Sequence, residues 1–189
     1  MMEQQFNTLQ LNTLQLNTLQ LIVLQQPEVH QIWQCLHQIA DPELPTLSIT
    51  DLGMVRAVLP FHTEQAGQTG WQVIFTPTYS GCPATEFLVN EIHTTLTQSG
   101  FSPVHVDVSL SPAWTTDWMN ADARQRLRES GIAPPQGSAC EKPADTESII
   151  CPRCSSHETE KISEFGSTAC KALYRCRQCL EPFDYFKCI

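Results

Sequence analysis

The stretch from residue 71 to residue 98, WQVIFTPTYSGCPATEFLVNEIHTTLTQ, contains two regular elements and the turn between them. Apolar residues alternate from Trp71 to Phe75, as they do in a β-strand with one buried face. After Pro83 the spacing becomes helical, and the expected buried stripe is Thr85, Leu88, Val89, Ile92 and Leu96. The stretch therefore predicts a strand, a tight turn and a helix over 83–98, with a single thiol, Cys82, in the turn.

The position of Cys82 gives this thiol a predicted function. Proline is favoured at the first position inside a helix, so Pro83 would make Cys82 the N-cap residue. A sulfur there lies beside unpaired amide groups and the positive end of the helix dipole, which favours the thiolate. Gly81 would allow a tight turn that leaves the sulfur accessible. We expect Cys82 to be a functional thiol, and the alternative is a small buried hydrophobic residue.

Further elements lie on both sides of this unit. We expect a helix from Pro27 to about Asp41, a strand over 48–61 with a turn at 51–53, a strand over 104–110 and a short helix over 120–131, capped by Asn120 or Asp122. The order α-β-β-α-β-α predicts an α+β protein in which residues 27–132 form a small α/β sandwich.

The two ends of the chain differ from this domain. Residues 1–26 contain three tandem NTLQL units whose period of five matches neither a helix nor a strand, which predicts a disordered low-complexity extension. Residues 133–149 contain three prolines and few apolar residues, so we expect a linker, with Cys140 as a spare thiol in it. Residues 150–189 form a cysteine-rich module.

Two Cys-x-x-Cys pairs in this module predict a metal site. Four thiolates from two tight turns can surround one tetrahedral ion, here Cys151, Cys154, Cys176 and Cys179. A module of this size has too little core to fold alone, so the metal would supply most of its stability. Zinc is the expected ion, in a short all-β ribbon built around one hairpin that turns near Gly166.

An iron–sulfur centre is the alternative cofactor, permanent or transient, because Cys170, Cys176 and Cys179 nearly follow a ferredoxin-type run with five residues in the first gap. Cys170 and Cys188 are left over by a four-ligand zinc site. They are either additional, more labile ligands or simply packed side chains.

Composition limits the possible partners. Residues 1–150 carry 5 basic and 15 acidic side chains, a net charge of −10, so a nucleic acid would be repelled by most of the chain. No apolar run approaches membrane-spanning length, and the nine cysteines are an odd number in a chain too long for a secreted disulfide scaffold. We therefore expect a cytoplasmic protein with reduced thiols and no membrane partner. Nucleic-acid binding is disfavoured, and only residues 151–189, with a net charge of +1, leave it open as an alternative.

Three stretches, IADPELPTLSITDLGMV, TPTYSGCPATEF and SPAWTTDWMNADARQRLRESGIAPP, resemble the SufT-like domain of iron–sulfur assembly proteins. The matching positions are Asp41-Pro42-Glu43, Asp51-Leu52-Gly53, Gly81-Cys82-Pro83 and Pro112-x-Trp114-Thr115. Joined to the cysteine-rich module, the chain from about Pro27 onward resembles the D-subunit family of bacterial phenylacetyl-CoA epoxidase systems (PaaD, also called PaaJ). The NTLQL repeat lies outside this pattern.

The resemblance implies an accessory protein of aerobic phenylacetate catabolism that is not itself catalytic. Its partners would be the di-iron oxygenase and the flavin/iron–sulfur reductase of the system, whose metal centres it would help to mature. The resemblance points to Cys82 as the functional residue, supported by Asp51 and Gly81. The alternative is a non-catalytic subunit that docks on the complex through the aromatic face of the ribbon.

Overall fold

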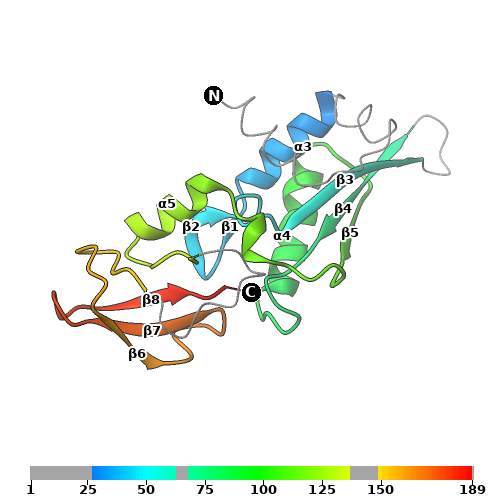
Figure 1. Cartoon of the computed structure of the whole chain (residues 1–189). Helices are drawn as coiled ribbons and strands as arrows, with labels where there is room; N and C mark the ends of the chain where they lie inside the picture. The colour runs from blue at the N-terminus through cyan, green and yellow to red at the C-terminus, as the bar shows by residue number, and fades with distance from the viewer. Residues whose placement is uncertain (1–26, 63–67, 137–148, 189) are drawn as a thin grey trace.

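The computed structural model describes residues 27–62, 68–136 and 149–188, which form an α/β domain followed by a small all-β ribbon (Figure 1). The expected fold class is therefore confirmed. The NTLQL extension, most of the expected linker and Cys140 lie outside the described residues. No helix in the described part of the chain has the length and apolar character needed to cross a membrane.

A three-stranded sheet in the order β3-β4-β5 forms one layer of the α/β domain. β3 (Val55–His62) and β4 (Thr69–Phe75) are antiparallel, whereas β4 and β5 (Val104–Val108) are parallel. A parallel pair needs a crossover connection, and α4 (Thr85–Gln98) supplies it. The strand expected over 48–61 is wrong in its first part, because β2 (Leu44–Ser48) pairs instead with β1 (Ala40–Asp41) in a separate hairpin.

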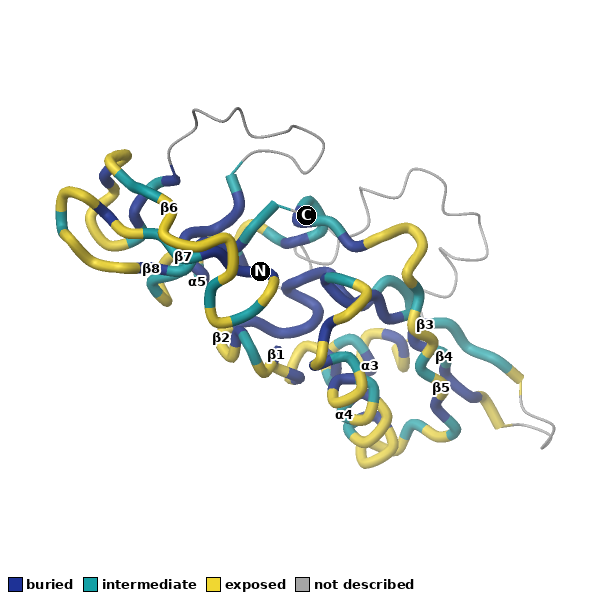
Figure 2. The backbone as a smooth tube through the Cα atoms, turned by 90° about the horizontal axis from the view of Figure 1, so that it is seen from below, coloured by how far each residue is buried: buried dark blue, intermediate teal, exposed yellow. Residues whose placement is uncertain are grey.

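Two helices form the second layer. α3 (Pro27–His37) and α4 contact one another, and each also contacts the sheet. Figure 2 shows buried stretches of backbone through the middle of the molecule. The fully buried side chains of this domain include Ile32, Leu36, Val73, Phe75, Leu88, Ile92 and Leu96. The expected stripe of β5 is buried only at its start, since Val108 and Leu110 remain about half exposed.

After β5 the chain forms a short 3-10 helix, η1 (Thr116–Trp118), and then α5 (Ala121–Glu129), which lies beside β2. Of the two predicted caps, Asn120 and Asp122, the structure has Asn120 as the N-cap of α5. Its side-chain oxygen accepts a hydrogen bond of 2.6 Å from the Ala123 N–H.

The ribbon is a three-stranded antiparallel sheet in the order β6-β7-β8. The strands are β6 (Thr159–Ser163), β7 (Lys171–Cys176) and β8 (Pro182–Phe186). The predicted hairpin with a turn near Gly166 is β6–β7, whereas β8 was not predicted. The prediction contained a single hairpin and therefore did not extend to the PFDYF segment.

The ribbon and the α/β domain share a hydrophobic core. Phe186 at the end of β8 is completely buried and packs edge-on against Trp114, with ring centroids 6.1 Å apart. Cys170 belongs to the same core cluster as the side chains of α3 and α4. Ala133, expected in the linker, is fully buried and exchanges backbone hydrogen bonds with Asp184 and Phe186 of β8. The described start of the linker is thus part of the junction.

Candidate functional site

The four predicted ligands of the ribbon lie together. Their sulfur atoms are all within 4.8 Å of one another: Cys151, Cys154, Cys176 and Cys179. The Sγ–Sγ distances are 3.8 Å between Cys151 and Cys179 and 3.5 Å between Cys154 and Cys176. A disulfide would require about 2 Å, so these are free thiols placed around a common centre.

This spacing fits a tetrahedral metal ion. Zn–S bonds of about 2.3 Å place the four sulfurs of a tetrahedron about 3.8 Å apart. The Cys179 N–H donates to the Sγ of Cys176 at 3.4 Å and is the main cause that lowers the pKa of Cys176 to about 6. An ion bound here would tie the loop before β6 to the β7–β8 turn and so stabilise the fold of the ribbon.

Cys170 and Cys188 lie outside this four-cysteine group. The Sγ of Cys170 is 3.6 Å from a carboxylate oxygen of Glu43, in the α/β domain. The Sγ of Cys188 donates to the Gln136 carbonyl oxygen at 3.1 Å. The ferredoxin-like run therefore does not gather around one centre, because Cys170 faces the other domain.

The structure corrects the predicted state of Cys82. α4 begins at Thr85 with Ala84 as its N-cap, so Cys82 precedes the cap by two residues and lies in the turn. Only 8% of Cys82 is exposed. Burial raises the pKa of its thiol, and the negative charges of Glu43 and Asp41 raise it further, which outweighs the lowering effect of the Ala84 N–H. The hydrogen bonds of Ala84 and Thr85 favour the thiolate, but burial and the nearby acids have the larger effect on the pKa.

Glu43 is the residue that sequence reasoning missed, because its role depends on a contact across 127 positions. It follows β1, in the turn that leads into β2. The carboxylate of Asp41 accepts hydrogen bonds of 2.9 Å from the N–H groups of Glu43 and Leu44, which holds this turn. The turn is the DPELP segment, and Asp41-Pro42-Glu43 is among the positions that resemble the SufT-like domain, but neither signal places Glu43 beside Cys170.

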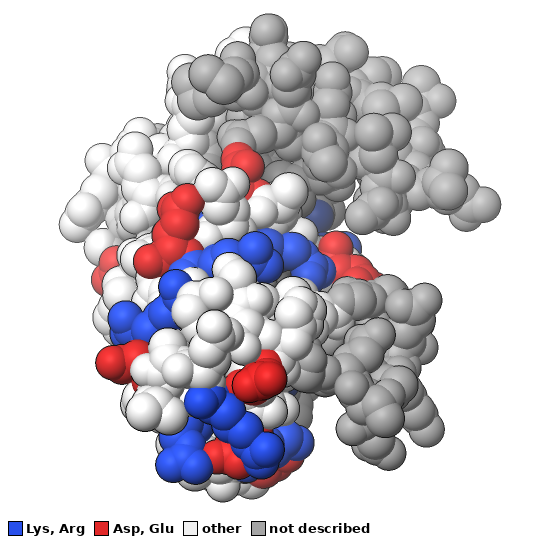
Figure 3. Space-filling view, turned by 60° about the vertical axis from the view of Figure 1, so that its left-hand side comes forward, with Lys and Arg blue, Asp and Glu red and all other residues white. Residues whose placement is uncertain are grey.

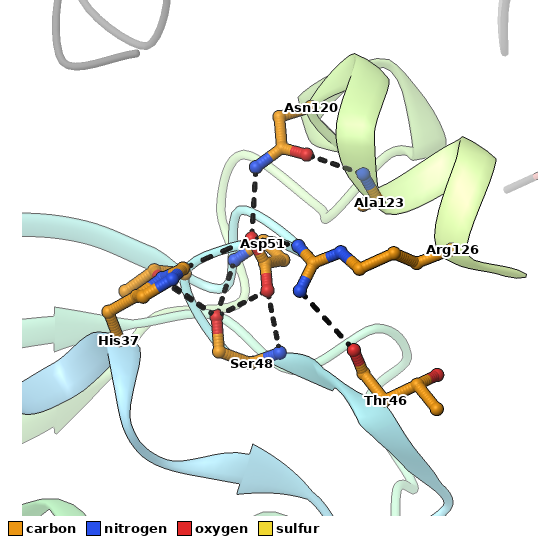
Figure 4. Close-up of polar contacts among 8 residues, drawn as sticks. His37, Thr46, Ser48, Asp51, Asn120, Ala123 and Arg126 are labelled. Atoms are coloured by element: carbon orange, nitrogen blue, oxygen red, sulfur yellow. Dashed lines mark hydrogen bonds and ion pairs between the residues drawn. The ribbon is translucent and has the colours of Figure 1, made fainter. Parts of the chain in front are cut away.

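Asp51 lies at the centre of a polar network inside the α/β domain (Figure 4). Its carboxylate accepts hydrogen bonds from the Ser48 N–H and hydroxyl, at 2.9 and 2.7 Å, and from the Asn120 amide at 3.1 Å. The Arg126 guanidinium lies 2.6 Å from the same carboxylate. Asp51 thus links the β2 turn to α5.

Burial alone would raise the pKa of Asp51, but the hydrogen bonds from Ser48, Arg126 and Asn120 together lower it. The carboxylate stays ionised inside this network. Asp51 contacts Ser48 at the end of β2, the α5 cap Asn120 and Arg126 of α5, so its role in the structure is to hold these segments of the domain together.

Gly81, the other residue expected to support Cys82, is exposed, and its φ lies outside the left-handed region that favours glycine. A Cβ atom at this position would meet the Tyr79 ring at 3.8 Å, an ordinary contact. The backbone therefore does not require glycine here. In the same domain Gly53 does have a positive φ of 67°, and a Cβ there would lie 2.5 Å from the Trp118 carbonyl oxygen.

Charges are mixed on the face that carries the ribbon and α5 (Figure 3). A band of Lys and Arg side chains crosses the middle of this face, a second basic group lies at its lower end, and Asp and Glu side chains lie beside both. Arg175 and Arg177 of the ribbon both pair with the carboxylate of Glu160.

Fold and site together define a two-part protein in which a four-cysteine ribbon is packed on an α/β domain that carries a buried free thiol. Two family models match these parts. Residues 30–108 match "Iron-sulfur cluster assembly protein", and residues 135–187 match "PaaD zinc beta ribbon domain".

A protein of Escherichia coli strain K12, named as the D subunit of a "Putative 1,2-phenylacetyl-CoA epoxidase", is 61% identical over 163 residues, covering 86% of this chain and 94% of the relative. The chain therefore belongs to the D-subunit family of phenylacetyl-CoA epoxidases.

Two solved structures were also found, each 24% identical to this chain. One is a crystal structure of a domain of unknown function, DUF59, from Bacillus anthracis (TM-score 0.47, covering 52% of this chain and 90% of that one). The other is the solution structure of a Mycobacterium tuberculosis protein described as associated with [Fe-S] complex assembly and repair (TM-score 0.34, covering 54% and 84%).

Proposed function

We propose that this protein is a cytoplasmic accessory factor of aerobic phenylacetate degradation that helps to assemble the metal centres of phenylacetyl-CoA epoxidase. Its clients are the di-iron oxygenase and the flavin/iron–sulfur reductase, and it does not itself catalyse ring epoxidation. The family assignment supports the pathway, and the match of residues 30–108 to an iron–sulfur assembly model supports the maturation role.

One observation carries the maturation role. Cys82 is a free thiol that lies within the matched assembly domain, apart from the four-cysteine group of the ribbon. Burial, and then the charges of Glu43 and Asp41, raise the pKa of this thiol and keep it protonated, and a metal ion displaces the thiol proton on binding. Because the thiol takes up its proton again when iron leaves, it binds iron reversibly. Reversible binding suits the transfer of iron to a client. The metal of the ribbon is zinc and has a structural role.

The test is to co-express the epoxidase system with the Cys82→Ala variant and to measure iron and acid-labile sulfide in the purified oxygenase and reductase. We expect metal occupancy and epoxidase activity to fall together by at least about tenfold, the effect typical of losing a metal-binding group. The matched control is Cys35→Ala, which removes a partly buried α3 thiol that donates to Ser99. Unchanged occupancy with Cys82→Ala would contradict the maturation role.

A docking role in the complex is the second candidate function. Most of the expected aromatic face is buried in the ribbon's own core, which includes Phe183 and Tyr185. Apolar side chains left exposed on the ribbon are Ile162, Phe165 and Leu180. Co-purification that survives Cys82→Ala with normal iron occupancy, but is lost when Phe165 and Leu180 are both replaced by serine, would favour docking.

A further inference from the structure

The junction between the ribbon and the α/β domain gathers metal-ligating side chains from three separate segments. Cys82 comes from the turn before α4, Glu43 from the turn between β1 and β2, and Cys170 from the residue before β7. Cys82 and Cys170 are both buried in the shared core, and Glu43 is half-buried at its edge. Figure 1 shows the ribbon strands β7 and β8 lying alongside the domain that supplies the other two residues.

A contact joins Glu43 to Cys170, and the charge of Glu43 acts on both thiols. Its carboxylate is 3.6 Å from the Sγ of Cys170, which also contacts the Thr168 hydroxyl at 3.0 Å. Burial is the main cause that raises the pKa of Cys82 and of Cys170, and the charge of Glu43 raises both. Tyr79 supports this arrangement, since its pKa is raised by burial and then by Cys82, Glu43 and Cys170. The 3.6 Å contact thus joins Glu43 to Cys170, and Cys82 lies in the same buried core, within reach of the charge of Glu43.

A buried cation is already present at this place. Only 5% of Lys171 is exposed, and its ammonium group donates to the Glu43 carbonyl oxygen at 3.4 Å. The charge of Lys171 acts on both Cys170 and Asp41. An ion with a charge of +2 bound by two thiolates and one carboxylate would leave a net charge of −1. Lys171 balances that charge without a solvent counterion.

We propose that Cys82, Cys170 and Glu43 form a second metal site, shared between the two parts of the chain, for a divalent transition-metal ion. This inference rests on the proposed function, in which the ion is the iron that is passed to the epoxidase. Thiolate and carboxylate ligands together suit Fe²⁺ and Co²⁺. Metal binding displaces one proton from each thiol and leaves the oxidation state of the ion unchanged.

The site is more open than the ribbon site. Within the described residues, the four ribbon cysteines are the one group of three or more potential ligands whose donor atoms all lie within 4.8 Å of one another. The junction ligands must therefore approach one another as the ion enters, and Glu43 provides the accessible side. A site that closes on its ion in this way binds more weakly than a preformed one, as a carrier requires.

The ribbon controls this site through Cys170. The backbone of Cys170 accepts a hydrogen bond of 3.0 Å from the Lys187 N–H, and the next residue, Lys171, pairs with Phe186 in the β7–β8 ladder. Only a folded ribbon holds Cys170 against Glu43. Zinc in the four-cysteine group therefore prepares the junction to take its ion.

The experiment is an anaerobic Co²⁺ titration of the full chain after its ribbon has been loaded with zinc. For the unmodified chain we expect about one further Co²⁺, with thiolate-to-cobalt charge-transfer absorption. Cys82→Ser, Cys170→Ser and Glu43→Gln should each weaken Co²⁺ binding by at least about tenfold. The controls Cys35→Ser and Cys188→Ser remove thiols outside the junction and should bind as the unmodified chain does.

Folding is checked by circular dichroism and by retained zinc, and Glu43→Gln tests the site even if Cys170→Ser unfolds the ribbon. The inference is overturned if the unmodified chain binds no Co²⁺ beyond the zinc site. It is also overturned if folded Cys170→Ser and Glu43→Gln bind Co²⁺ normally.

The outcome is separable from that of the proposed function. If Cys82→Ala lowers iron occupancy of the epoxidase while Cys170→Ser and Glu43→Gln do not change Co²⁺ binding, the shared site is wrong and the maturation role stands. If the titration identifies all three ligands but Cys82→Ala leaves occupancy unchanged, the site stands and the maturation role is wrong.

Discussion

Asp51 illustrates how one residue can stabilise the domain without taking part in its chemistry. Its side chain is 2% exposed, yet it is ionised, because Ser48, Asn120 and Arg126 supply the hydrogen bonds and the positive charge that water would otherwise supply. Removal of a buried carboxylate leaves these donors unpaired, which is costly in the protein interior.

We expect Asp51→Ala to lower the free energy of unfolding by about 3 kcal/mol, a value reduced from that of a fully buried pair because Arg126 is partly exposed. Urea unfolding followed by circular dichroism would measure it. The control Asp107→Ala removes an exposed carboxylate of β5 and should change stability by less than about 0.5 kcal/mol. Equal effects of the two variants would contradict the framework role of Asp51.

The same residue gives a pH dependence. The pKa of Asp51 is lowered in the folded state from the ordinary 3.8, so its stabilisation is fully present above pH 3.8. It is lost as the pH falls below 3.8 through the lower folded value. The stability difference between the unmodified chain and Asp51→Ala should therefore shrink in acid, and a constant difference would be inconsistent with an ionised Asp51.

At the scale of single elements, the two helix starts differ. α5 begins at Asn120, whose oxygen accepts from the Ala123 N–H while its amide donates to Asp51. α4 begins at Ala84, which makes no side-chain cap hydrogen bond. The start of α5 is thus determined locally and then tied to the core, whereas α4 depends on the packing of its buried stripe.

Asn120→Ala should destabilise the protein by about 2 kcal/mol, since it removes both the cap and the hydrogen bond to Asp51. Asn120→Ser can restore the cap but not the longer reach to Asp51, so it should recover about 1 kcal/mol of that loss. Thermal unfolding of the three proteins gives the comparison. A serine variant as unstable as the alanine variant would mean that the cap contributes nothing.

On the scale of the whole molecule, the two parts fold around a common core. Phe186 of the ribbon packs on Trp114, and the Trp114 indole N–H donates to the Leu52 carbonyl oxygen at 2.8 Å inside the α/β domain. The ribbon therefore contributes Phe186 and Cys170 to the core cluster to which Cys82 belongs. Loss of the ribbon metal should loosen both parts.

Phe186→Ala should cost about 3–5 kcal/mol, because it leaves a large cavity at a fully buried position. Because the core is shared, hydrogen exchange should increase in α3 and α4 as well as in β7 and β8. Phe165→Ala is the matched control, since that ring is 62% exposed, and its effect should stay below about 1 kcal/mol. Faster exchange confined to the ribbon would show that the two parts are independent.

Local patterns were sufficient for much of this structure. The helices predicted over 27–41 and 83–98 are present but shorter, over 27–37 and 85–98, because β1 occupies residues 40–41 and α4 begins at Thr85. The Asn120 cap, one of two predicted, and the grouping of the four ribbon cysteines also depend on residues close in the sequence. The 48–61 strand was wrong at its start, since the pairing of β1 with β2 competes with it and spacing alone does not reveal pairing.

The sequence by itself determined that this protein joins an α/β domain to a four-cysteine module, because helical and strand periodicities and paired Cys-x-x-Cys turns are local properties. Only the tertiary structure decided the state of Cys82 and the place of Cys170. The pKa of a thiol depends on burial and on charges that arrive from distant segments, here Glu43 and Asp41 for Cys82. No local pattern encodes which residues the packing of a ribbon on a domain brings into contact.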